Sequence, residues 1–138
     1  MEVKHWTTTK NTTAFEYAHE NMSYDESILN SLTDHQRVER FYIWKNPGVT
    51  YSFKQGCPEN MELLDHSIRM TGGGVVFHSP GDIVFSISSG SDDPLYPKKP
   101  TDKLRSVSKR IINAIESSGV TLDQTTTSTR VDYAFCQT

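Results

Sequence analysis

Cysteine is scarce in this chain, which has only Cys57 and Cys136 among its 138 residues. Two cysteines cannot build the disulfide framework of a small secreted domain, so stability must come from an apolar core. A chain of this length can form such a core, and we expect a single domain over residues 1–138. The first residues contain no apolar secretion signal, which predicts a cytoplasmic protein.

Long hydrophobic runs and a strong net charge are also missing. No stretch approaches the ~20 apolar residues that a membrane helix needs. The 14 Lys and Arg residues nearly balance the 17 Asp and Glu residues, for a net charge of −3. This balance argues against a nucleic-acid or membrane-binding surface. Basic side chains do cluster over residues 98–110. This cluster is either a solvated helix face or a docking surface for an acidic protein.

Two segments have helical patterns. Thr13 and Glu16 have the spacing of a capping box, and apolar residues follow at helical spacing up to residue 32. Asp25 falls on that apolar stripe, where it caps, pairs with something across the fold, or lies at the edge. The second helix is predicted to begin with Thr101 as its N-cap and to end at Gly119. A short helix is also predicted over residues 58–66.

The remaining segments predict strands, which makes the fold α+β (α/β) with a mixed, largely antiparallel sheet. The turn signal Asn46-Pro47-Gly48 indicates that the strands on either side of it form a hairpin. The predicted strands cover residues 38–44, 49–54, 67–70, 75–78, 83–89, 120–123 and 131–135.

Three consecutive glycines at residues 72–74, between two predicted strands, are the most informative feature. Glycine has more backbone freedom to lose than any other residue, so this run indicates close approach of the backbone to something. Arg69 precedes the run and favours an anionic ligand, which backbone N–H groups can also bind. The segment lacks the patterns of a P-loop and of a dinucleotide-binding fold. A bulged hairpin turn is the alternative interpretation.

The glycine segment resembles the signature of the lipoate–protein ligase A and octanoyltransferase family, within the biotin/lipoate ligase superfamily. Residues 69–78 read Arg-Met-Thr-Gly-Gly-Gly-Val-Val-Phe-His, followed by Gly81 and by Phe-Ser-Ile at residues 85–87. Two further matches keep the family's order. Residues 21–29 resemble its Asn-Met-Ala-x-Asp-Glu-Ala-Leu-Leu helix, and residues 41–55 resemble its aromatic hairpin. Together the matches cover roughly residues 14–136.

The resemblance implies a mixed sheet with packed helices that binds an acyl-adenylate. Lipoate or octanoate would be activated with ATP and Mg²⁺ and passed to a lysine of an acceptor domain. The implied acceptors are the lipoyl domains of 2-oxoacid dehydrogenase complexes or the glycine cleavage H protein. A packed structural role is the alternative for His78. The residues implied to bind the acyl-adenylate are Arg69, Thr71, Gly72, Gly73, Gly74, Val76, Phe77, His78, Gly81 and Asp82.

Several positions depart from the family pattern. Ile68 replaces the first of two arginines, and Asp82 replaces the asparagine of the family's Gly-Asn pair. Ser52 and Phe53 replace the second glycine and the arginine of the hairpin. The chain also stops at Thr138, before the segment that contains the family's catalytic lysine. We therefore expect inefficient ligation by these residues alone, because that lysine stabilises charge at the reacting groups.

Three alternatives stay open beside the ligase hypothesis. A cysteine-type octanoyltransferase would use Cys136 as its acyl acceptor and would need no ATP. A non-enzymatic homologue would bind an acyl-adenylate or an acceptor protein without turnover. Biotin ligation is the weakest, since the Gly-Arg-Gly-Arg type of loop is missing.

Overall fold

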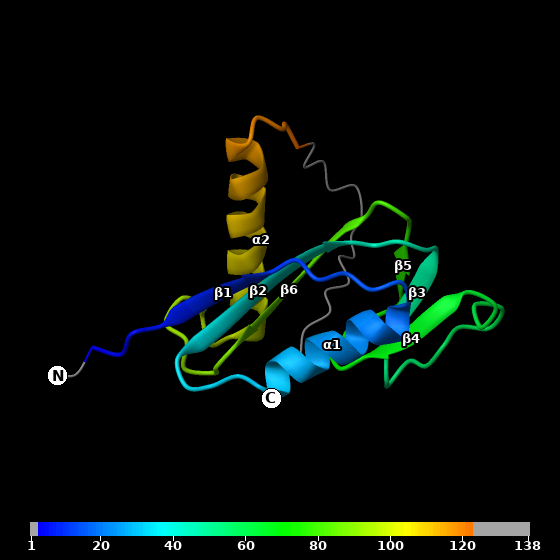
Figure 1. Cartoon of the computed structure of the whole chain (residues 1–138), viewed down its shortest axis with the longest axis horizontal. Helices are drawn as coiled ribbons and strands as arrows, with labels where there is room; N and C mark the ends of the chain where they lie inside the picture. Colours follow the sequence, from blue (N-terminus) through cyan, green and yellow to red (C-terminus); the bar gives the residue numbers. More distant parts are fainter. Residues whose placement is uncertain (1–2, 123–138) are drawn as a thin grey trace.

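The computed structural model describes residues 3–122, which form two three-stranded sheets and two helices (Figure 1). The fold is α+β, as predicted, and both sheets are mixed. The elements follow in the order β1 (Thr7–Asn11), α1 (Ala18–Asn30), β2 (Gln36–Ile43), β3 (Gly48–Ser52), β4 (Asp65–Arg69), β5 (Val76–His78), β6 (Ile83–Ser89) and α2 (Pro100–Ser117).

Each sheet has one parallel and one antiparallel pair of strands. The first sheet has the order β1-β2-β6, with β1 parallel to β2 across the α1 crossover and β6 antiparallel to β2. The second sheet has the order β4-β3-β5. There β4 runs parallel to β3, and β5 is antiparallel to it with Thr50 opposite Val76. The strand that follows the glycines therefore lies beside β3.

The hairpin predicted between the strands over residues 38–44 and 49–54 is wrong, because the corresponding strands, β2 and β3, belong to different sheets. The backbone of Trp44, just after β2, pairs with the loop over residues 79–82. Its N–H donates to the Asp82 carbonyl and its carbonyl accepts from the Gly81 N–H, both at 2.9 Å. The turn then redirects the chain into β3. There a Cβ on Gly48 would lie 3.0 Å from the Asp65 carbonyl and 3.3 Å from the Trp44 ring.

The start of α1 also differs from the prediction. The helix begins at Ala18, and the Glu20 carboxylate accepts the Tyr17 N–H at 3.2 Å, so Thr13 and Glu16 do not cap it. The Asp65 carboxylate, from the start of β4, accepts the Ala18 N–H at 2.8 Å. A negative group from the second sheet therefore caps the positive end of α1, which no local pattern could show.

Two further helix predictions are also wrong: the short helix over residues 58–66 and the N-cap of α2. Residues 58–64 form turns instead of a short helix, and Leu63 there is 95% exposed, so no core is available to hold a helix. Helix α2 begins at Pro100, which suits the first helical position, and Lys99 takes the N-cap place predicted for Thr101. Its predicted end is confirmed, since Gly119 has φ +91° after the C-cap.

The two helices lie on opposite faces of the first sheet (Figure 1). Helix α1 covers the face that presents Tyr42 and Val84, and Ala18, Tyr42 and Trp44 form the buried core there. Helix α2 stands over the other face, and none of its residues is fully buried. Its apolar stripe is therefore only half covered.

The predicted strand at residues 120–123 does not form over 120–122, and the one at 131–135 lies outside the described residues. Neither α1 nor α2 is long and apolar enough to cross a membrane.

Candidate functional site

The buried Arg69 side chain ties the glycine segment to the second sheet. Arg69 ends β4 and is 7% exposed. One terminal guanidinium nitrogen donates to the Thr50 hydroxyl of β3 at 2.9 Å. The other donates to the carbonyls of Gly74 at 2.6 Å and Gly72 at 3.3 Å. The arginine therefore holds the loop by its carbonyl oxygens, which leaves the loop N–H groups for other partners.

The Arg69 charge has no anionic partner within residues 3–122. No carboxylate there lies within 4.0 Å of the guanidinium, although each of the other buried arginines has one. Burial lowers the pKa of Arg69, yet an arginine starts so far above neutral pH that it stays charged. Its Nε–H is also buried without a hydrogen-bond partner among these residues. A desolvated cation with an unused donor favours an anionic ligand.

The glycine loop has the conformation that its sequence requires. Gly73 has φ +95°, in the region that side chains rarely adopt, so glycine is needed there. None of the described residues accepts a hydrogen bond from the N–H groups of Gly72, Gly73 or Gly74. Three successive N–H groups that donate to none of residues 3–122 can bind an anion. The site thus offers donors from the loop as well as from Arg69.

His78, at the end of β5, is held by Thr50 and Trp44. Its Nε2 lies 2.9 Å from the Thr50 hydroxyl oxygen, and its ring stacks on Trp44 with centroids 4.0 Å apart and planes 14° apart. Burial, and then the charge of Arg69, lower the pKa of His78, against a smaller opposing effect of Asp82. We therefore expect a neutral imidazole at pH 7.

The loop after β5 is closed by its own hydrogen bonds. The exposed Asp82 carboxylate accepts the Ser79 N–H at 2.7 Å, and Asp82 also donates its N–H to the Ser79 carbonyl at 3.0 Å. Gly81 has φ +94° and its N–H binds the Trp44 carbonyl. This loop therefore fixes Trp44, and through it the ring of His78. A direct role of Gly81 and Asp82 in ligand binding stays a prediction.

The structure brings some of the predicted site residues together around Thr50 and places Phe77 on the opposite face of the sheet. Arg69 and His78 meet at the Thr50 hydroxyl, Arg69 also binds the loop carbonyls, and Val76 lies directly opposite Thr50 in the sheet. Phe77 alternates with Val76 and His78 in β5, so it points to the opposite face, where it is 63% exposed. Thr71 is half-buried. Cys136 lies outside the described residues.

The sequence interpretation missed Thr50 and Trp44, which connect the parts of the site. Thr50 is 1% exposed and is the common partner of Arg69 and His78. The alternating pattern of residues 49–53 indicated a strand but not which neighbours it would have. Only the pairing of β3 with both β4 and β5 shows what Thr50 contacts.

Arg40 organises a second polar cluster, beneath α1. Its guanidinium is fully buried and binds the Asp25 carboxylate at 2.8 Å and the Asn21 side-chain oxygen at 2.7 Å. The Ser86 hydroxyl donates to Asp25 at 2.7 Å. Asp25 therefore pairs across the fold, which settles the alternatives left by the sequence. The Tyr42 ring lies 3.7 Å from the guanidinium, and burial raises the pKa of its hydroxyl.

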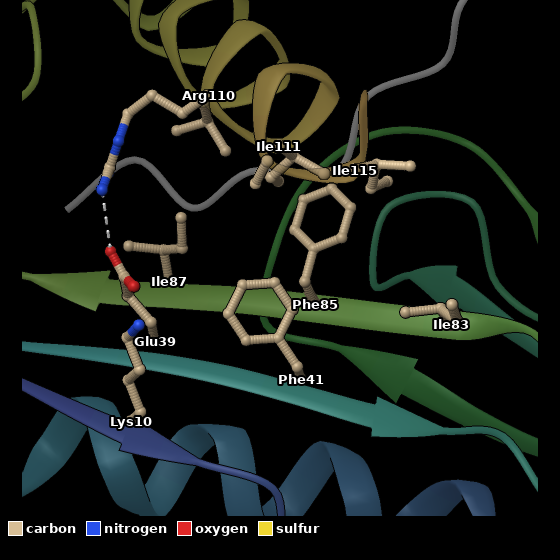
Figure 2. Close-up of a pocket in the computed structure, with 11 residues that line it drawn as sticks. Lys10, Glu39, Phe41, Ile83, Phe85, Ile87, Arg110, Ile111 and Ile115 are labelled. Atoms are coloured by element: carbon tan, nitrogen blue, oxygen red, sulfur yellow. Dashed lines mark hydrogen bonds and ion pairs between the residues drawn. The ribbon is translucent and has the colours of Figure 1, made fainter. Parts of the chain in front are cut away.

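An apolar pocket of about 350 Å³ lies between α2 and the outer face of the first sheet (Figure 2). Figure 2 shows Phe41 and Phe85 pointing from the sheet toward Ile111 and Ile115 of α2. An ion pair of 3.2 Å between Arg110 and Glu39 closes one end. The pocket is on the face of β2 opposite Arg40, and it contains none of the predicted site residues.

Comparisons with known proteins agree with this fold. The family model of the lipoyl protein ligase A/B catalytic domain matches residues 17–134. Octanoyltransferase LipM of Clostridioides difficile (strain 630) is 27% identical over 112 residues, which are 75% of this chain and 41% of that protein. This chain therefore spans about two fifths of that relative.

Three solved structures are similar in fold at 22–23% identity. A bipartite lipoate protein ligase of Thermoplasma acidophilum, studied with its E2 lipoyl domain, has a TM-score of 0.65 over 85% of this chain and 48% of its own. The T. acidophilum protein Ta0514 with bound lipoic acid has a TM-score of 0.60, over 88% and 53%. Lipoate–protein ligase A bound with ATP has a TM-score of 0.62, over 92% and 52%.

The family predicted from the glycine segment is therefore confirmed, and these residues span about half of the structures that they match. The chain belongs to the lipoyl protein ligase A/B catalytic domain family.

Proposed function

We propose that these residues form the acyl-adenylate-binding part of a lipoate–protein ligase, which activates lipoate or octanoate with ATP and passes the acyl group to an acceptor lysine. The observation that supports this most directly is the buried Arg69, which has no carboxylate within 4.0 Å in residues 3–122. An acyl-adenylate contains one phosphate and would supply the missing negative charge.

The groups around Arg69 suit the two ends of such a ligand. The N–H groups of residues 72–74 and the Arg69 Nε–H are donors for phosphate oxygens. Val76 presents an apolar side chain on the same face as Thr50, where an acyl chain would avoid water. Mg²⁺ would arrive with the ATP phosphates, because residues 3–122 contain no cluster of metal-binding side chains.

These residues would bind and orient the adenylate rather than perform the transfer alone. Arg69 would neutralise the phosphate, and the loop N–H groups would fix its oxygens. His78 is expected to be neutral and adds no second charge. The transfer to the acceptor lysine needs further stabilisation of charge, which the family resemblance assigns to a lysine of the family's Lys-Val/Ile-x-Gly-x-Ala motif.

The exposed basic side chains of α2 and the loop before it suit an acidic acceptor domain. They include Lys98, Lys99, Lys103 and Lys109, which are all exposed, and Arg105, whose side chain is 83% exposed. Their charges would speed the encounter with an acidic lipoyl domain and would be screened by salt. We propose lipoyl domains of 2-oxoacid dehydrogenase complexes or the glycine cleavage H protein as the acceptors.

Thermal unfolding with a non-hydrolysable lipoyl-AMP analogue tests the proposal. Ligand at ~100 times its dissociation constant should add about 2.7 kcal/mol to the free energy of unfolding. We expect the melting temperature to rise with this analogue and not with biotinyl-AMP. Arg69→Met should remove the rise, whereas the exposed Arg105→Met should keep it. A folded protein that shows no rise would contradict adenylate binding.

A cysteine-type octanoyltransferase is the second candidate, because the curated relative at 27% identity is an octanoyltransferase. Cys136 would then form a thioester with the acyl group. Mass spectrometry after incubation with an octanoyl donor protein would detect an added octanoyl group, and Cys136→Ser should abolish it. A ligase should tolerate Cys136→Ser. Binding of the lipoyl-AMP analogue without any acyl transfer would instead favour a non-enzymatic homologue that binds the acyl-adenylate without turnover.

A further inference from the structure

The Thr50 hydroxyl lies between two groups of the proposed site. It is buried in the middle of β3, with Arg69 on the neighbouring strand β4 and His78 on the other neighbour β5. Arg69 donates to its oxygen at 2.9 Å, and His78 Nε2 lies 2.9 Å from the same oxygen. One hydroxyl therefore connects the anion-binding cation with the only ring nitrogen of His78 that bonds to a residue in the described range.

Counting protons fixes the direction of these bonds. A guanidinium can only donate, so the Thr50 oxygen must accept from Arg69. The hydroxyl has one proton, and His78 Nε2 is its remaining partner among the described atoms. If Nε2 carried a proton of its own, the buried hydroxyl proton would have no acceptor, which is unfavourable. Thr50 therefore donates to Nε2, and the proton of the neutral ring is on Nδ1.

The surroundings of His78 keep the ring in this neutral form. The charges that face it are Arg69, which disfavours a second proton, and Asp82, which favours one more weakly. Burial also disfavours the charged ring. The Trp44 ring covers one face of the imidazole, so its plane is fixed. None of the described residues bonds to Nδ1.

We propose that Thr50 is a positioning residue that holds His78 as the neutral Nδ1–H tautomer, so that His78 offers a hydrogen-bond donor to the ligand and not a general base. The ligand part of this inference rests on the proposed function. With His78 as a donor, the groups that we assign to the anion are all donors: Arg69 Nε–H, the loop N–H groups and His78 Nδ1–H. Such a site selects anionic oxygens and disfavours an uncharged amide of the same acyl chain.

Nitrogen NMR of the imidazole ring tests the tautomer without any ligand. Long-range proton–nitrogen spectra distinguish a protonated from an unprotonated ring nitrogen, and the His78→Asn spectrum assigns the signals. We expect Nδ1–H in the wild type at pH 7.5 and in Thr50→Ser, which keeps the hydroxyl. Thr50→Val keeps the shape without the hydroxyl, and we expect it to populate Nε2–H. Thr9→Val, an exposed strand position, should change nothing.

Two outcomes would overturn the inference: a wild-type ring with its proton on Nε2, or a Thr50→Val ring that keeps Nδ1–H. Should Thr50→Val fail to fold, the wild-type and Thr50→Ser spectra still decide the tautomer. Binding is measured separately with the lipoyl-AMP analogue. We expect about a 10- to 100-fold loss of affinity in Thr50→Val and recovery in Thr50→Ser. If no variant binds the analogue, the proposed function fails while the tautomer result stands.

Discussion

Arg69 donates to the Gly74 carbonyl at 2.6 Å, so the arginine that precedes the glycine loop is bound to that loop. The sequence suggested that this side chain contacts a ligand anion, but three of its four terminal N–H groups already donate to the protein. Its influence on a ligand would therefore come mainly through its charge, its remaining N–H groups and the position of the loop N–H groups. This arrangement makes the loop and the arginine one unit.

Arg69→Lys should separate the charge from the geometry. Lysine keeps the positive charge but cannot donate to Thr50 and to two carbonyls with a planar fork. We expect at least about a tenfold loss of affinity for the lipoyl-AMP analogue, with a loss of stability of about 1–3 kcal/mol from unpaired buried groups. Calorimetric titration and urea unfolding measure the two effects. Arg105→Lys, at an exposed position, should alter neither.

Gly73→Ala should weaken binding through the backbone alone. The left-handed conformation of Gly73, with φ +95°, costs a residue with a side chain about 1–2 kcal/mol. We expect the loop to rearrange and the affinity for the analogue to fall. Gly56→Ala is the matched control, because Gly56 also has a positive φ, of +70°, but is not one of the predicted site residues. Equal affinities of the two variants would mean that the loop N–H groups are not the anion site.

His78 should make stability depend on pH in a defined direction. Its pKa is lowered in the folded protein, so between the folded value and the ordinary value near 6.5 the unfolded chain binds more protons. Its stabilising contribution is therefore complete above pH 6.5 and is lost as the pH falls through the folded pKa. His78→Asn should flatten this part of the curve. Urea unfolding at several pH values measures it, and an unchanged curve would contradict the assignment.

Elements with local signals agreed best with the sequence prediction. Gly119 marked the end of α2, and the strand predicted over residues 83–89 coincides with β6. The β2–β3 hairpin failed because Asn46-Pro47-Gly48 signals a change of direction without naming the strand that will pair. That choice depends on Trp44 bonding to residues 81 and 82, far along the chain. Thr50 was missed for the same reason, since three strands define its contacts.

Asp25→Ala should be among the most destabilising single substitutions in α1. It leaves the fully buried Arg40 guanidinium without its carboxylate, and breaking a buried ion pair in this way costs about 3–5 kcal/mol. Asp102→Ala removes a partner of the exposed Arg105, 3.8 Å away, and should cost at most about 1 kcal/mol. Urea unfolding compares the two. Similar losses would mean that Asp25 is not essential for holding Arg40.

The two faces of the first sheet should respond differently to truncation. Trp44 is 1% exposed and packs against Tyr42 and His78, so Trp44→Ala should cost about 3–5 kcal/mol. Phe85 is 41% exposed in the pocket beneath α2, and because so much of its ring already meets water, Phe85→Ala should cost clearly less. Chemical unfolding of both variants measures the difference. A larger loss for Phe85 would mean that its face of the sheet is covered more fully in solution than residues 3–122 cover it.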